Sequence, residues 1–304
     1  MPHAADRTAL IAFAQKSIAR GSKSFAFASK LFDRKTLERV WLLYAWCRAC
    51  DDMADGQDHG GAMAAVDDPK ARLTAIRALT AKAMRGDITS EPAFDCLGIV
   101  AAECGLTQKM ADDVIQGFAL DVAGWRPQTD EDLQQYCFHV AGAVGVMMAA
   151  VMGVPADDEA TLSRACHLGL AFQYANIARD IAEDDAAGRC YLPAAWIAAQ
   201  AIPAGALMQP LYLTQLTQMA ARLCDASARY EASARVGAAR LPFRSRWAVL
   251  SAAGIYGDIA RKVRAAGSDA WDQRISVSKW EKLMQVMAAW WLAVGFRKTE
   301  ENPL

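Results

Sequence analysis

Two segments of the chain carry acidic side chains at intervals that would place them on one face of a helix. In the first segment, Tyr44, Arg48, Asp51 and Asp55 follow one another at spacings of four, three and four residues. Residues three and four apart are neighbours on a helix, so these side chains would share one face. Two carboxylates one turn apart on a mostly apolar helix repel each other, and a cation between them would remove that repulsion.

The second segment repeats this arrangement with oxygen-bearing side chains. Gln173, Asn176, Asp180 and Asp184 are spaced by three, four and four residues, and Arg179 directly precedes the first carboxylate. An isolated D-x-x-x-D pattern is weak evidence, because a solvated helix face explains most cases. Two such stripes, each with its own arginine and apolar flanks, favour a functional site.

Oxygen ligands of this kind suit a hard cation such as Mg²⁺ or Mn²⁺. Magnesium commonly takes one or two carboxylates together with substrate phosphates, and it keeps several waters. Two facing carboxylate helices therefore predict a cage for a metal–diphosphate complex, in which the carbon–oxygen bond of the substrate breaks more easily. Other Asp-Asp pairs, at 67–68 and 157–158, lie beside prolines and are interpreted as loop or cap residues.

The cysteines and histidines do not form a second metal site in the sequence. Cys47 and Cys50 make a C-x-x-C, but no second pair at zinc spacing accompanies it, so we interpret them as core residues of a helix. His139 and His167 fall within expected helices and are interpreted as satisfied core or edge residues.

Helices must position these side chains, because alanine is abundant and the chain lacks the short β-branched runs typical of strands. Proline and glycine breakers separate expected helices at 6–19, 22–31, 34–55, 70–85, 91–104, 107–123, 130–152, 158–185, 194–199, 211–236, 242–265 and 276–296. Thr107 and Asp158 are expected to cap two of them. Since no repeat or linker interrupts the pattern, we expect one all-α domain spanning 1–304.

The composition of the chain limits the classes of function that we expect for the protein. The chain has 304 residues, 54% of them hydrophobic, and a formal net charge of -1, so no global field favours nucleic acid. The first twenty residues lack an apolar signal core, and with eight cysteines this leads us to expect reduced thiols and a cytoplasmic setting.

The longest apolar run, 283–296, is too short for a confident membrane span of about 20 residues. Its tryptophans and the lysines and arginines around it would suit a membrane surface. We favour a terminal helix packed on the core and keep peripheral contact with the inner face of the membrane as the alternative.

The motifs resemble those of the squalene and phytoene synthase family. Residues 168–193 read L-G-x3-Q-x2-N-I-x-R-D-I-x2-D-x4-R-x-Y-x-P, and residues 136–145 read Y-C-x2-V-A-G-A-V-G. The opening S-K-S-F at 22–25 resembles the family's N-terminal substrate-side segment. The resemblance runs from about residue 10 to residue 290, with the carotenoid-forming bacterial members closest in appearance.

This resemblance implies an isoprenoid-synthase helical bundle with a central apolar cavity, and it implies a role for particular residues. The metal ligands would be Asp51, Asp55, Asn176, Asp180 and Asp184. The diphosphates would be contacted by Arg48, Arg179, Arg189, Tyr191 and Arg274, with Lys23 as a helper, and Ser22 and Gln173 would be further substrate-binding residues. Tyr44, Tyr136 and Tyr256 would lie near the reacting carbons. The prenyl tunnel would be lined by Phe25, Val140, Val144, Gly145, Ala165 and Phe172.

The activity implied by the resemblance is head-to-head condensation of two geranylgeranyl diphosphates, through prephytoene diphosphate, to phytoene. It requires Mg²⁺ or Mn²⁺ and no nicotinamide cofactor. Two alternatives remain at this point: a squalene or dehydrosqualene synthase acting on farnesyl diphosphate, and a non-catalytic family member. The oligomeric state is not indicated by the sequence.

Overall fold

The computed structural model describes residues 6–55 and 68–300, leaving aside the side chains at 23–24, 55 and 296–300. All regular secondary structure in the described residues is helical and none of it is strand, which confirms the expected all-α class. Its α-helices are α1 (Arg7–Gly21), α2 (Lys23–Ser29), α3 (Arg34–Asp55), α4 (Pro69–Met84), α5 (Pro92–Cys104), α6 (Gln108–Val122), α7 (Asp130–Cys137), α8 (Ala143–Val151), α9 (Glu159–Ala186), α10 (Ala194–Ala199), α11 (Leu213–Ala238), α12 (Phe243–Ala266) and α13 (Lys279–Glu300).

Local sequence signals begin several of these helices where the structure has them. The Thr107 hydroxyl accepts a hydrogen bond from the backbone N–H of Met110 at the start of α6, and Asp158 caps α9 through Thr161, which confirms both expected caps. Pro69 and Pro92 occupy the first turns of α4 and α5, where a missing N–H costs nothing.

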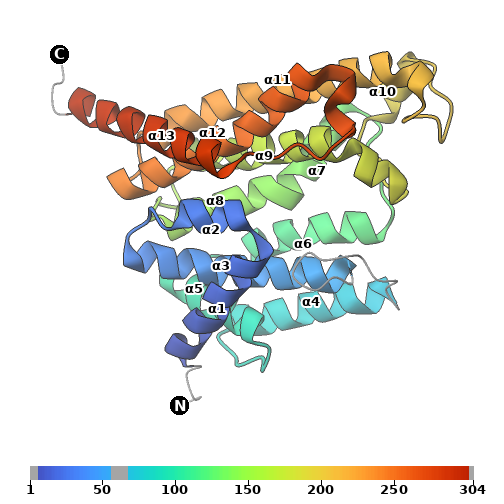
Figure 1. Ribbon diagram of the computed structural model, residues 1–304. Helices are drawn as coiled ribbons and strands as arrows, with labels where there is room; N and C mark the ends of the chain where they lie inside the picture. The colour runs from blue at the N-terminus through green and yellow to red at the C-terminus, as the bar shows by residue number, and fades with distance from the viewer. Residues whose placement is uncertain (1–5, 56–67, 301–304) are drawn as a thin grey trace.

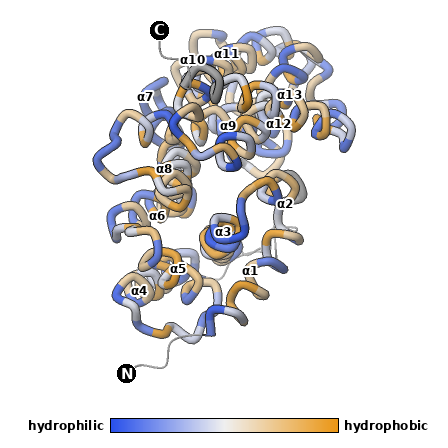
Figure 2. Tube along the Cα trace, turned by 90° about the vertical axis from the view of Figure 1, so that its left-hand side faces the viewer, coloured by the Kyte–Doolittle hydropathy of each residue, from blue (hydrophilic) through white to orange (hydrophobic). Residues whose placement is uncertain are grey.

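Helix α9 runs through the middle of the molecule and links two layers (Figure 1). One hydrophobic core joins residues of α1, α3, α4, α5, α6 and α8, and a second joins residues of α7, α9, α11 and α12. Figure 2, turned by 90° from that view, shows α11, α12 and α13 at the top, α5, α4 and α1 at the bottom, and α8, α6, α3 and α2 between them. Because α9 contacts α8, α11 and α12, its side chains are held from several directions.

The expected continuous helix at 130–152 is interrupted, which corrects that prediction. Residues Phe138–Gly142 form one π-helical turn between α7 and α8. Close packing explains this: a Cβ placed on Gly169 of α9 would lie 2.2 Å from the carbonyl oxygen of Ala141, so α9 and the π turn touch backbone to backbone. Such single π turns are frequent at functional sites.

Among the described helices, none is long and apolar enough to cross a bilayer.

Candidate active site

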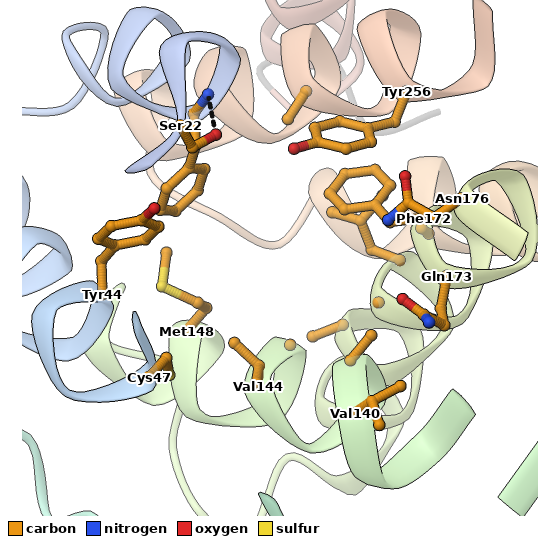
Figure 3. Close-up of a pocket in the computed structure, with 18 of the residues that line it drawn as sticks. Ser22, Tyr44, Cys47, Val140, Val144, Met148, Phe172, Gln173, Asn176 and Tyr256 are labelled. Carbon is orange, nitrogen blue, oxygen red and sulfur yellow. Dashed lines mark hydrogen bonds between the residues drawn. The ribbon is translucent and has the colours of Figure 1, made fainter. Parts of the chain in front are cut away.

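A cavity of about 730 Å³ lies between α2, α3, α6, α8, α9, α11 and α12 (Figure 3). The carboxylates, the amides and most of the arginines that line it come from α3, α6, the second half of α9 and the segments after α9 and α12. Apolar side chains, including Val140, Val144 and Met148, form the floor in the view of Figure 3. A cavity with one charged end and one apolar end suits a substrate with a charged head and a hydrocarbon tail.

The structure brings together all the predicted site residues whose side chains it describes. The cavity is lined by Ser22, Phe25, Tyr44, Arg48, Asp51, Tyr136, Val140, Val144, Gly145, Ala165, Phe172, Gln173, Asn176, Arg179, Asp180, Asp184, Arg189, Tyr191, Tyr256 and Arg274. The side chains of Lys23 and Asp55 lie outside the described part of the structure, so their predicted roles stay predictions. Residues more than 250 positions apart in the chain thus line the same cavity.

On α3, an arginine holds the carboxylates of the first stripe. Arg48 Nη1 lies 2.9 Å from Asp51 Oδ2, and Arg48 Nη2 lies 2.5 Å from Asp52 Oδ1. These bonds fix the arginine at the cavity edge although it is mostly buried. Asp52 was not among the predicted residues, since the helical spacing selects position 51 instead.

On α9, two arginines converge on Asp180. Arg179 donates from Nε at 2.7 Å and from Nη2 at 2.5 Å, and Arg274 Nη2 lies 3.2 Å from the same carboxylate. Arg274 also reaches Glu183 at 3.2 Å, so this neighbouring carboxylate is ion-paired as well. Arg274 comes from the segment between α12 and α13, about ninety residues away along the chain. A charged cluster of this kind is suited to bind a polyanion.

Asp184 lies one helical turn after Asp180, with other carboxylates nearby. Burial, and then the neighbouring Asp180, raise its pKa to about 7, while Arg189 opposes the shift. A carboxylate whose ionised form is this unfavourable in the protein alone gains from a nearby cation. In the described part of the chain, no three His, Cys, Asp or Glu side chains are already gathered as a metal site. The donor set of Asn176, Asp180 and Asp184 nevertheless has the all-oxygen chemistry that Mg²⁺ and Mn²⁺ require.

Asp121 of α6 is a site residue that sequence reasoning missed. Its carboxylate accepts hydrogen bonds from the hydroxyls of Tyr136 and Tyr191, each at 3.0 Å. The two tyrosine rings stack with centroids 4.8 Å apart. Burial raises the pKa of both phenols, so they stay protonated and act as donors. Only the folded chain reveals this triad, because Asp121 belongs to neither stripe.

Aromatic pairs form part of the cavity wall, with Phe172 and Tyr256 at the upper right and Tyr44 at the left of Figure 3. The Phe172 and Tyr256 rings stack at 4.1 Å, which joins α9 to α12, and the Phe25 and Tyr44 rings lie 5.7 Å apart between α2 and α3. Burial also raises the pKa of Tyr44 and Tyr256. These faces can stabilise positive charge on carbon through their π electrons.

The predictions for Cys50 and for the two histidines agree with the structure, whereas Cys47, also predicted to be a core residue, lines the cavity. All eight cysteines are free, and Cys50 is fully buried inside α3. His139 Nδ1 lies 2.8 Å from the carbonyl oxygen of Asp113, and His167 Nδ1 lies 2.8 Å from Ser233 Oγ. Both histidines are thus satisfied by local hydrogen bonds.

Comparison with known proteins identifies the family. Residues 18–281 match the family described as squalene/phytoene synthase. The chain is 46% identical to a phytoene synthase from Pseudescherichia vulneris, over 97% of this chain and 95% of the relative, and 47% identical to a 15-cis-phytoene synthase from Enterobacter agglomerans, over 93% and 96%. A crystal structure of a dehydrosqualene synthase with bound ligand superposes with a TM-score of 0.83 at 25% identity, covering 97% of this chain and 98% of the other. The chain therefore belongs to the squalene/phytoene synthase family.

Proposed function

We propose that this protein condenses two molecules of geranylgeranyl diphosphate head to head to give phytoene and two diphosphates. The observation that carries the proposal is the cavity, in which carboxylates and arginines meet at the head of a long apolar chamber. Both relatives are named as phytoene synthases, which agrees with this activity. Their sequences are 46% and 47% identical to this chain over almost its full length.

Two metal-binding walls are part of the proposal. Asp51 and Asp55 on α3 would hold Mg²⁺ or Mn²⁺ on one side, and Asn176, Asp180 and Asp184 on α9 would do so on the other. A divalent cation bound there would neutralise the negative charge of the diphosphate oxygens as the carbon–oxygen bond breaks.

The chain's own cations would bind and orient the diphosphates. Arg179 and Arg274 now hold Asp180, and Arg48 holds Asp51. When a substrate diphosphate enters, these planar donors can turn toward its oxygens without crossing the cavity. Arg189 and Tyr191 stand beside them on the segment after α9, and Gln173 lies on the same helix face as Asn176 (Figure 3).

The reaction balances as one condensation followed by one rearrangement, and each step releases a diphosphate and a proton. The first substrate loses diphosphate by breaking its C1–O bond, the double bond of the second substrate attacks the allylic cation, and loss of a proton closes a cyclopropane. The resulting prephytoene diphosphate loses its diphosphate, rearranges, and gives up a second proton to form the central double bond. The apolar floor excludes water, which would otherwise quench either cation. Tyr44, Tyr136 and Tyr256 would lie along the reacting carbons.

The lower-ranked alternatives differ in substrate or in chemistry. A dehydrosqualene synthase has the same fold, and it would use C15 substrates. A reductive branch would need a nicotinamide cofactor, whereas proton loss needs none. A non-catalytic member would have no use for the ion-paired arginines and carboxylates that line this cavity.

Helix α13 would bring the enzyme to the surface of a membrane. Trp280, Met284, Met287 and Trp291 recur at spacings of four, three and four, and all are exposed, both tryptophans at 68%. The opposite face packs on α12, where Trp247 Nε1 donates to the carbonyl of Val286 at 2.8 Å. A single helix carrying this much exposed apolar surface marks an interaction site.

The charge of this region fits an anionic lipid surface. Lys279 and Lys282 stand at the start of α13, and Arg297 and Lys298 follow its apolar part in the sequence. Tryptophan beside lysine is the composition of helices that lie in the membrane interface. We therefore place the enzyme in the cytoplasm at the inner face of the membrane, where a C40 hydrocarbon product would be received.

Two experiments test these proposals. Purified protein is given geranylgeranyl or farnesyl diphosphate with Mg²⁺ or Mn²⁺, and the extracted products are identified by mass and chromatography. We expect phytoene as the main product from the C20 substrate; a preference for the C15 substrate would overturn the assignment. For the membrane surface, the Trp280→Ala/Trp291→Ala double variant should bind phosphatidylglycerol-containing vesicles at least about tenfold more weakly than a Phe13→Ala/Ile88→Ala control. Equal binding would refute the role of α13.

A further inference from the structure

The cavity has a second end, far from the carboxylates. Helix α9 lines the cavity from Thr161 and Arg164 at its start to Asp180 and Asp184 near its end. From 164 to 180 the helix rises by about 24 Å at 1.5 Å per residue. With carbon–carbon bonds of about 1.5 Å, an isoprene unit extends about 5 Å and four units about 20 Å. A prenyl tail that starts at Asp180 would therefore end beside Arg164.

Many side chains at this distal end are small, although the larger Leu241 and Val249 also line the cavity from neighbouring positions. Ala165 on α9, Ala234 and Ala238 on α11, and Ala248 and Ala252 on α12 all line the cavity there. Small side chains leave room for a tail along the cavity, but they are too short to close the cavity at its end. The closure must come from a larger side chain.

Arg164 is such a side chain, and it is held in place. It packs on Gly237 of α11, where an added Cβ would come within 2.6 Å of Arg164 Cβ and 3.0 Å of its Cδ. Its Nη1 donates to the carbonyl oxygen of Ser233 at 3.2 Å and lies 3.4 Å from Ser233 Oγ. Ser233 Oγ is itself 2.8 Å from His167 Nδ1, so the clamp joins α9 to α11.

The two parts of the Arg164 side chain lie in different surroundings. Its guanidinium is directed to the polar backbone of α11, and its methylene stem lies between the helices at the cavity wall. Arginine commonly covers apolar surface with its stem while its charge finds polar partners. A hydrocarbon tail would thus meet an apolar wall, although the residue is charged.

We infer that Arg164 determines substrate chain length by closing the distal end of the prenyl cavity. The inference rests on the proposed function, and it adds a residue that neither carboxylate stripe points to. The stem admits a tail of four isoprene units and excludes a fifth. Removing it opens the space between α9 and α11 at Gly237.

The test compares selectivity rather than activity alone. Diphosphate release is measured for Arg164→Ala and the unmodified protein with C15, C20 and C25 prenyl diphosphates. We expect the ratio of kcat/KM for the C25 substrate to that for the C20 substrate to rise at least about tenfold. Loss of a merely structural clamp would lower all three values together, so an unchanged ratio overturns the inference.

Two further variants keep the result interpretable. Arg164→Met retains the length of the stem without the charge, and it should keep the selectivity of the unmodified protein; a shift as large as that of Arg164→Ala would show that the wall is not the cause. If Arg164→Ala fails to fold, Arg164→Val still shortens the stem while packing on Gly237, and the same ratio decides. Phytoene formation by the unmodified protein tests the proposed function separately.

Discussion

The hydrogen bonds to Asp121 allow a stability prediction that separates its charge from its acceptor role. Tyr136 and Tyr191 are 3% and 8% exposed, and both hydroxyls donate to Oδ1 of Asp121 at 3.0 Å. Asp121→Ala leaves both buried donors without this acceptor. Each orphaned group costs about 1–3 kcal/mol, and because the hydroxyls face a cavity that water can enter, the lower end applies, so the loss is about 2 kcal/mol in all.

Asp121→Asn is the matched control. The amide keeps an oxygen at the Oδ1 position, which can accept from both tyrosines, so most of that loss should be avoided. Both variants remove the same negative charge, and with it the same contribution to the raised pKa of Asp184. The difference between the two variants therefore excludes the effect of the charge and reports the loss of the acceptor together with the loss of side-chain volume.

The assay is thermal unfolding followed by circular dichroism without metal or substrate. The melting temperature shifts by about 2–4 °C per kcal/mol for chains of about 150–250 residues and by less for a longer chain, so we expect the Ala variant to melt roughly 3 °C below the Asn variant. Tyr191→Phe should lower the melting temperature less than Asp121→Ala, and should have little further effect when added to it. Equal melting of the Ala and Asn variants would refute the triad as a stabilising feature.

The other predictions concern turnover. Asp180→Asn should lower kcat at least about 100-fold with an unchanged helical spectrum, since an amide is a poorer ligand for a hard cation; near-normal activity at saturating metal would remove Asp180 from the metal set. Arg179→Lys should lower kcat/KM about tenfold or more and exceed the effect of Lys23→Gln, because a lysine lacks the planar fork; equal losses would contradict this. A chelator should abolish diphosphate release and added Mg²⁺ or Mn²⁺ should restore it, whereas full activity in excess chelator would refute metal dependence. NADPH should change neither product nor rate; a product with two more hydrogens at its centre would indicate the reductive branch.

The positions of the helices followed from the sequence to within a few residues, because the breakers are strong local signals. Pro92, Gly105 and Pro242 mark ends that depend on the backbone alone. The π turn at 138–142 was not predictable, since each of its residues is compatible with an ordinary helix. It results from the close approach of α9 to Ala141, a contact between segments that the sequence separates.

The site shows the same division between local and tertiary information. Asp51 and Asp180 could be selected because their neighbours repeat at helical spacing on one element. The sequence alone gave no reason to place Asp121 beside Tyr136 and Tyr191, or to set Arg164 across from Gly237. These contacts join different helices or, for Tyr191, a helix and the segment after α9, and periodicity carries no information about which segments meet. Arg274 was found only through the family resemblance, and its bond to Asp180 explains its position.

The length of α9 ties the two halves of the chemistry together. One helix presents the carboxylates for the diphosphate at one end and the residues that would close the tail space at the other. Because a helix rises by a fixed amount per residue, the distance between the charged head and the end wall is set by the count of residues between Asp180 and Arg164. A substitution at one end of α9 should change the function of that end and leave the residues at the other end in place. Chain-length selectivity and ionisation should therefore respond independently to substitution, so that Arg164→Ala leaves the metal requirement intact and Asp180→Asn leaves the order of substrate preference intact.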